Sequence, residues 1–277
     1  MPEVPRAETH DDLTIQALLE RMWSDYVRLN PMASRIHQLL SGRGESVAND
    51  HIALRTFDLP CVGLNVLARP FVERGYVAKG AYEFPEKKLV ARHFEAQYAS
   101  LPKIFISEIR VAALPRQAAE LISHLVELVP TDRRERPDFC VAGRLWPLSF
   151  AQYQDLAAAS DYAAWVAAFG FRPNHFTVDV NALRSFGSLA EVNDLLKQNG
   201  FVLNTSGGEI KGSPEDLLEQ SSTLANLVDV ELSDGVHQIP ACYYEFARRY
   251  PGPDGRLYQG FIAASADKIF ESTSRGQ

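Results

Sequence analysis

Two stretches of sequence, NDHIALRTF (residues 49–57) and PNHFTVDV (residues 173–180), decide the fold that we expect for this chain. Both are rich in β-branched and aromatic residues, which favour strands, and side chains on a strand alternate between its two faces. His51 therefore shares a face with Arg55 in the first stretch, and His175 lies on the matching face of the second. The opposite faces are mostly apolar and belong against helices. We expect the polar faces to line a cavity, because burying unpaired polar groups is costly.

The elements that follow these two strands come in a similar order. The first strand is followed by a predicted helix over 61–74, closed by Gly75, and by strands over 76–82, 88–95 and 104–111. The second is followed by a predicted helix over 188–198, closed by Gly200, and by strand-like segments at 201–204, 209–212, 224–231 and 237–246. Such a repeat predicts an α+β fold built from two similar modules. Two βαβββ modules, 45–112 and 171–248, would form one shared, strongly curved mixed sheet with flanking helices.

Amphipathic patterns indicate helices in the rest of the chain. Apolar residues recur near the helical period within 11–41 and 113–169, where 149–169 reads as one helix and 130–137 as a linker. We expect a single domain over 1–277, in which residues 249–277 form a C-terminal extension.

Composition narrows the classes of function. The chain has 277 residues and a formal charge of −7, which gives a nucleic-acid role no electrostatic support. No apolar run reaches the roughly 18 residues that a membrane span needs. Its three cysteines include no CxxC pair, which argues against a zinc knuckle or a disulfide framework and fits a reducing cytosol. We therefore expect a cytoplasmic protein that acts on small molecules, in an oligomeric state that the sequence leaves open.

A third segment, CYYEFA (residues 242–247), places Glu245 among aromatic residues. Together with His51 and His175 it supplies two imidazoles and one carboxylate, the set that holds ferrous iron in many oxygen-using enzymes. Such a site leaves positions open for a 2-oxo acid and O₂. Arg55 could grip a carboxylate of the substrate in a two-pronged contact.

Simpler interpretations of these residues stay open. Each histidine could be an ordinary hydrogen-bonded residue, Glu245 could lie exposed on an edge strand, and Arg55 could form an ion pair with Asp58 or Glu108. Glu108 lies in the last strand of the first module, where we expect it to match Glu245 of the second. It could be a fourth metal ligand or an acid/base group. We favour a role in which it orients His51 or Arg55.

The segments resemble those of the 2-oxoadipate dioxygenase/decarboxylase family within the vicinal oxygen chelate superfamily. The resemblance rests on DHIALRTF (50–57), FISE (105–108), NHFT (174–177), QSST (220–223) and YEFAR (244–248), and it spans about residues 18–261. The chain looks like a short member, without the long insertions of larger relatives.

The resemblance implies Fe(II) held by His51, His175 and Glu245, with Arg55 holding the substrate. The implied reaction converts 2-oxoadipate, or a similar 2-oxo diacid, and O₂ to 2-hydroxyglutarate and CO₂ in lysine breakdown. Manganese, nickel, cobalt or zinc could occupy the same site in preparations. Two alternatives remain: a glyoxalase-like isomerase or lyase that uses Glu108 as a fourth ligand, and a non-catalytic module that binds a small molecule.

Overall fold

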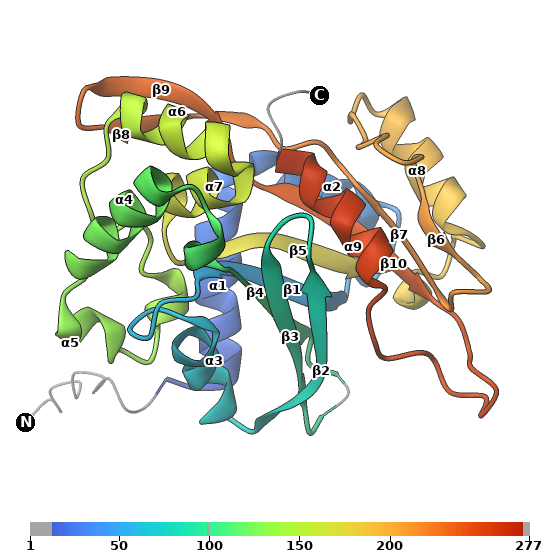
Figure 1. The fold of residues 1–277 in the computed structure, drawn as a ribbon. Helices are drawn as coiled ribbons and strands as arrows, with labels where there is room; N and C mark the ends of the chain where they lie inside the picture. Colours follow the sequence, from blue (N-terminus) through green and yellow to red (C-terminus); the bar gives the residue numbers. More distant parts are fainter. Residues whose placement is uncertain (1–12, 99, 274–277) are drawn as a thin grey trace, which may run out of the picture.

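A strongly curled, eight-stranded mixed sheet forms the centre of the protein (Figure 1). The computed structural model describes residues 13–98 and 100–273. The strand order is β2-β3-β4-β1-β5-β10-β7-β6. The strands of this sheet are β1 (Asn49–Phe57), β2 (Tyr76–Phe84), β3 (Leu89–Ala96), β4 (Lys103–Ile109), β5 (Pro173–Asp179), β6 (Lys211–Ser213), β7 (Leu218–Ser222) and β10 (Tyr243–Arg249). The predicted α+β fold with one shared curved sheet is confirmed.

The two strands that open the halves of the sheet lie side by side at its centre. β1 and β5 pair in antiparallel fashion, with His51 opposite Thr177 and Ala53 opposite His175. β1 is parallel to β4 and β5 is parallel to β10, so strands from 49–109 form one half and strands from 173–249 the other. Opposed residues point to the same side of a sheet. Both histidines therefore lie on one face, here called the inner face.

Helices cover both faces of the sheet (Figure 1). On the outer face, Phe176 packs against Trp23 and Tyr26 of α1, with ring centroids 5.1 and 4.9 Å apart. On the inner side, α7 contacts β1, and α9 contacts β2, β6 and β7. The helices are α1 (Ile15–Leu29), α2 (Pro31–Gly42), α3 (Leu64–Val72), α4 (Arg116–Glu127), α5 (Thr131–Arg134), α6 (Phe150–Ala159), α7 (Asp161–Phe169), α8 (Leu189–Gln198) and α9 (Ala263–Phe270).

Capping residues explain where several helices end. Gly75 and Gly200 follow α3 and α8 with φ of 87° and 79°, in the left-handed region that glycine adopts most easily, as the sequence predicts. The single helix expected over 149–169 is wrong. It breaks into α6 and α7 at Ser160, whose extended backbone and side-chain oxygen cap α7 by accepting from the backbone N–H of Ala163.

The second half departs from the expected strands. β7 was not expected, whereas the predicted segment 224–231 lies largely in β8 (Leu227–Leu232), which pairs with β9 (Gly235–Pro240) in a separate hairpin. The strand predicted over 237–246 is in fact β9 and β10, which belong to different sheets. The expected linker 130–137 contains α5. Residues 11–12 of the first predicted helical segment, and 274–277 of the C-terminal extension, lie outside the described residues.

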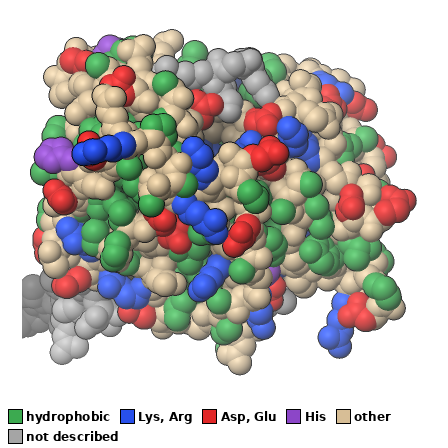
Figure 2. All heavy atoms as spheres, in the orientation of Figure 1, with side chains coloured by type: hydrophobic (Ala, Val, Ile, Leu, Met, Phe, Trp, Pro, Cys, Tyr) green, Lys and Arg blue, Asp and Glu red, His purple; other side chains and the backbone are tan. Residues whose placement is uncertain are grey.

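Within the described residues, no helix is both long and apolar enough to cross a membrane. On the face seen in Figure 2, acidic and basic side chains are interspersed.

Candidate metal centre

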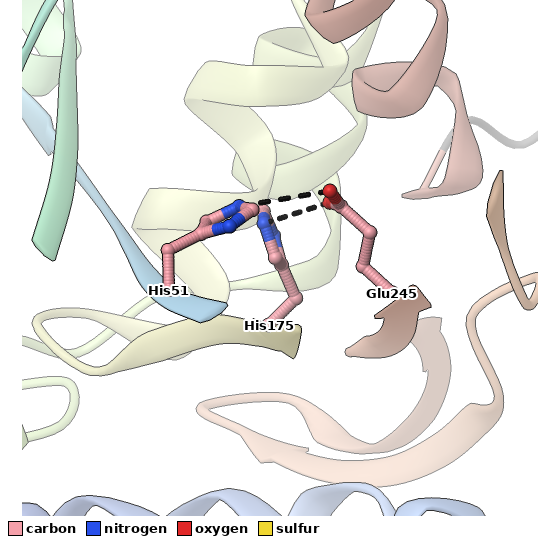
Figure 3. A group of neighbouring side chains, drawn as sticks. All are labelled: His51, His175 and Glu245. Atoms are coloured by element: carbon pink, nitrogen blue, oxygen red, sulfur yellow. Dashed lines mark ion pairs between the residues drawn. The ribbon is translucent and has the colours of Figure 1, made fainter. Parts of the chain in front are cut away.

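His51, His175 and Glu245 meet on the inner face of the sheet (Figure 3). Each offers a ligand atom, and these three atoms all lie within 4.8 Å of one another. Nε2 of His175 is 3.1 Å from Oε2 of Glu245, and Nε2 of His51 is 3.6 Å from Oε1. All three side chains are buried. Neighbouring strands β1, β5 and β10 thus turn three polar side chains from distant parts of the chain toward one point.

The environment sets charge states that suit a metal ion. Burial lowers the pKa of His175 to about 4, and nearby Glu245 offsets only part of this effect. Burial alone would raise the pKa of Glu245, but the two histidines and a hydrogen bond from Gln220 outweigh it, so the pKa is lowered. A neutral imidazole and an anionic carboxylate are the forms that bind divalent metals. This group of side chains could therefore hold a metal ion.

The residue before each histidine fixes the orientation of its ring. Oδ1 of Asp50 lies 2.8 Å from Nδ1 of His51, and Oδ1 of Asn174 lies 3.1 Å from Nδ1 of His175. The pairing of β1 with β5 skips both Asp50 and Asn174, so the register shifts at each place. Because these oxygens accept, each Nδ1 carries the hydrogen and each Nε2 keeps its lone pair toward Glu245.

Asp50 is also half of a buried ion pair. Its carboxylate accepts from Nε and Nη2 of Arg249 at 2.6 and 2.9 Å, and both side chains are buried. Although burial opposes ionisation, the charge and hydrogen bonds of Arg249 hold the pKa of Asp50 well below its usual range. Nη1 of Arg249 donates to the carbonyls of Tyr258 and Gly260. The orientation of His51 is thereby linked to the chain segment that follows β10.

Two further side chains contact the group. Nε2 of Gln220 on β7 donates to Oε1 of Glu245 at 2.6 Å, and Oγ1 of Thr177 lies 3.1 Å from Nε2 of His51. Gln220 belongs to the QSST segment that supported the family resemblance, but its contact with Glu245 was not expected. It fixes the position of the carboxylate.

Arg55 lies buried on the same inner face, with 2% of its surface exposed. Nη1 donates to Oγ1 of Thr273 at 3.1 Å, and the guanidinium carbon lies 5.1 to 5.5 Å from the ring centroids of Tyr162, Trp165 and Phe270. Nε and Nη2 have no hydrogen-bond partner among the described residues. The alternative of an ion pair with Asp58 or Glu108 is not found there.

A cavity of about 220 Å³ reaches Arg55 from the surface. Its lining consists of Arg55, Glu86, Lys87, Lys88, Ala159, Ser160, Asp161, Tyr162, Phe270 and Thr273. The two histidines and Glu245 are not part of this lining, so Arg55 is the residue of the candidate site that the cavity reaches.

Glu108 lies on the outer face, away from this group. It is paired with Thr56, and its Oε2 accepts from the backbone N–H of Leu64 at 2.7 Å, at the start of α3. The register places Phe105, not Glu108, in the position that corresponds to Glu245. The expected equivalence of the two glutamates is therefore wrong. A carboxylate at a helix N-terminus pairs an otherwise free N–H group and interacts favourably with the helix dipole.

The C-terminal segment covers the inner face. The Phe261 ring meets that of His51 edge-on at 4.8 Å, and the segment continues through α9 to Phe270 and Thr273, which contact Arg55. The sequence indicated only an extension here. The aromatic residues of this segment were the one sequence signal that it packs over the inner face. Such residues also occur in ordinary cores, so the signal is not specific.

The curled sheet confirms the predicted α+β fold, which the chain shares with a Ralstonia eutropha JMP134 protein provisionally described as a member of the glyoxalase superfamily, 20% identical with a TM-score of 0.69 over 95% of this chain and 92% of that one. The family model for 2-oxoadipate dioxygenase/decarboxylase matches residues 13–136 and 140–256. The chain belongs to this family.

Relatives with known names or structures cover most of the chain. A protein of Oryza sativa subsp. japonica, called 2-oxoadipate dioxygenase/decarboxylase, chloroplastic/amyloplastic, is 34% identical over 96% of this chain and 80% of its own. The crystal structure of the Oryza sativa hydroxyglutarate synthase in complex with 2-oxoadipate is 32% identical, with a TM-score of 0.89 over 100% of this chain and 98% of that one. A Shewanella frigidimarina NCIMB 400 protein, provisionally described as a hydrolase, is 51% identical, with a TM-score of 0.87 over 91% and 99%.

Proposed function

We propose that this protein is an Fe(II)-dependent dioxygenase and decarboxylase that acts on 2-oxoadipate or a similar 2-oxo diacid in lysine breakdown. The substrate and O₂ would give 2-hydroxyglutarate and CO₂, with one oxygen atom entering the new carboxylate and the other the new hydroxyl group. The main support is the buried group of His51, His175 and Glu245 on the same face as Arg55, whose Nε and Nη2 have no hydrogen-bond partner in the part of the chain that the structure describes. The names of the rice relatives support the choice of substrate.

The residues present fit a metal ion. Two imidazoles whose Nε2 atoms face an ionised carboxylate supply three ligands on one side and leave other positions open. Fe(II) held by His51, His175 and Glu245 would supply the binding and activation of O₂. Manganese, nickel, cobalt and zinc accept similar donors, so the choice of iron is part of the proposal.

The side chains of this protein would bind and orient the substrate. Arg55 would hold a substrate carboxylate through its unpaired N–H groups, a contact that the flat guanidinium can make in a two-pronged way. Gln220 keeps Glu245 in place, and Phe261 covers His51, so the group is shielded from water. Fixed orientation of the reacting groups lowers the entropic part of the barrier.

The glyoxalase-like alternative required Glu108 as a fourth ligand. Glu108 instead binds the start of α3 on the outer face, so the structure favours the site with three protein ligands. The cytoplasmic location stays a prediction, which fractionation of the source cells would check.

Oxygen uptake tests the proposed function. The protein is loaded with Fe(II) without oxygen, and O₂ is then added with 2-oxoadipate while O₂, CO₂ and 2-hydroxyglutarate are measured. We expect equal amounts of O₂ consumed and CO₂ released, and no uptake with adipate, which lacks the oxo group. Absence of uptake with every 2-oxo diacid tried would reject the proposal.

A further inference from the structure

Several buried polar atoms of the inner face have no hydrogen-bond partner among the described residues. They are Nε and Nη2 of Arg55, the hydroxyl of Tyr243 and Oε1 of Gln220. Tyr243 is 0% exposed and Arg55 and Gln220 are each 2% exposed. An unpaired buried polar atom costs about 1–3 kcal/mol, so a group of them on one face points to a ligand that completes their hydrogen bonds.

The sheet register places Tyr243 level with His175, at the end of the metal-binding group that is nearer to Arg55 along the strands. Tyr243 is paired with His175, and the two rings stack at 4.5 Å with an interplanar angle of 24°. β1 runs antiparallel to β5 and β10, so the step from Glu245 to Tyr243 and the step from His51 to Arg55 lead in the same direction. Both side chains lie at the same end of the group, on the inner face.

Electrostatics agree with this placement. Burial raises the pKa of Tyr243 far above its usual value, and the charge of Arg55 opposes that rise while Glu245 adds to it. Both charged groups therefore lie close to the phenol. The guanidinium lies close enough to the phenol oxygen for a weak hydrogen bond from Arg55 to oppose the rise as well. Within the described residues, the phenol O–H has no acceptor, and Nε and Nη2 of Arg55 make no well-formed hydrogen bond, so both side chains can donate to a third group.

The next residue offers a natural contrast. Tyr244 is also fully buried, and its hydroxyl also lacks a partner among the described residues. Its side chain points to the outer face, where the ring packs against Trp23, Tyr26 and Phe246. Burial is the one cause of its raised pKa. Of these two tyrosines, Tyr243 is the one whose hydroxyl lies near a cation, Arg55, that also has donors without a partner among the described residues.

We propose that Tyr243 and Arg55 together bind the substrate carboxylate that lies farther from the metal, so that Tyr243 helps to select diacids. Ala53 is paired with His175, and Arg55 lies two residues farther along β1, so Arg55 belongs to the end of the group that the more distant carboxylate would reach. A phenol and a guanidinium supply donors for both oxygens of a carboxylate. This inference rests on the proposed function.

Paired tyrosine variants test the inference. Tyr243→Phe keeps the ring that stacks on His175 and removes only the hydroxyl, and Tyr244→Phe is the matched control. Binding of 2-oxoadipate and of the monoacid 2-oxohexanoate is measured by calorimetry on Fe(II)-loaded protein without oxygen. Steady-state kinetics and metal content are measured alongside.

For Tyr243→Phe we expect binding of 2-oxoadipate to weaken by about 10- to 100-fold, the value of one hydrogen bond to a charged group. Binding of 2-oxohexanoate and metal content should match the wild type, and KM for 2-oxoadipate should rise while kcat changes far less. Tyr244→Phe should equal the wild type in every measurement.

Three results would overturn the inference while the proposed function stands. They are unchanged binding of 2-oxoadipate by Tyr243→Phe, equal weakening for the diacid and the monoacid, and loss of metal from this variant. A wild-type protein that consumes O₂ with none of the 2-oxo diacids would reject the proposed function, and the inference with it.

Discussion

The two halves of the curled sheet contribute unequally to the candidate site. Each provides a histidine held at Nδ1 by the side-chain oxygen of the preceding residue. The half with β1 adds Arg55 but no carboxylate, because Phe105 occupies the place that Glu245 holds in the other half. The half with β10 adds Glu245 and Tyr243. Similar backbones thus carry different charges: one half places the buried cation of Arg55 on the inner face, and the other places the carboxylate of Glu245 beside both histidines.

The two histidines also differ in how they are held. Asp50 is charged and pairs with Arg249, which binds carbonyls of the segment covering the inner face. Asn174 is neutral and has no such link among the described residues. We infer that His51 is the more strongly oriented of the two, because charge-assisted hydrogen bonds are stronger than neutral ones.

The largest expected effect is a loss of metal affinity, and it should occur on substitution of Glu245 but not of Glu108. Glu245→Gln removes the anionic ligand, and we expect metal affinity to fall by more than about 100-fold, since loss of an outer partner of a ligand already costs 10- to 100-fold. Activity should fall to background. Metal analysis after dialysis checks this, with Glu108→Gln as the control that keeps its metal. Equal metal loss in both variants would contradict the contrast between the halves.

A smaller effect is expected at Arg55. Arg55→Lys keeps a cation but loses the flat, two-pronged donor, so KM for 2-oxoadipate should rise by about 100-fold. Metal content should stay at the wild-type level. Parallel kinetics and metal analysis measure both quantities. Loss of metal would show that Arg55 supports the ligands rather than the substrate.

The substitution Asp50→Asn gives both histidines an asparagine as the partner of Nδ1. We expect metal affinity to fall by about 10- to 100-fold, because a neutral amide oxygen holds the ring of His51 less strongly than a carboxylate does. Stability should also fall, since Arg249 loses its counter-charge in a buried position. Metal titration and thermal unfolding measure the two effects.

The double variant Asp50→Asn/Arg249→Met separates these effects. Removing the buried cation should restore part of the thermal stability and none of the metal affinity. If Asp50→Asn binds metal as tightly as the wild type, the negative charge of Asp50 does not contribute to metal binding through His51.

The smallest effect should come from Glu108. Glu108→Gln weakens the contact with the start of α3, and we expect a loss of about 1 kcal/mol in the free energy of unfolding. Chemical denaturation measures this value. Activity and KM should not change, and a change in either would bring Glu108 back into the site.

Much of the fold could be predicted because its signals are local. Alternating apolar residues indicated β1 and β5, and glycines marked the ends of α3 and α8. The second half was predicted less well. The hairpin of β8 and β9 interrupts it, and no local pattern shows which of several short strands joins which sheet.

The sequence by itself determined the α+β fold, the two histidine strands and the candidate set His51, His175 and Glu245. Only the tertiary structure decided that Glu108, which the sequence left open as a fourth ligand, does not join them. Successive residues of a strand point to opposite faces. Glu108 lies three residues after Phe105, the counterpart of Glu245, so Glu108 points outward where Glu245 points inward. The pairing of Asp50 with Arg249, 199 residues away, and the cover formed by the C-terminal segment also depend on the folded chain. Contacts between residues so distant in sequence leave no periodic pattern, because the curvature of the whole sheet brings them together.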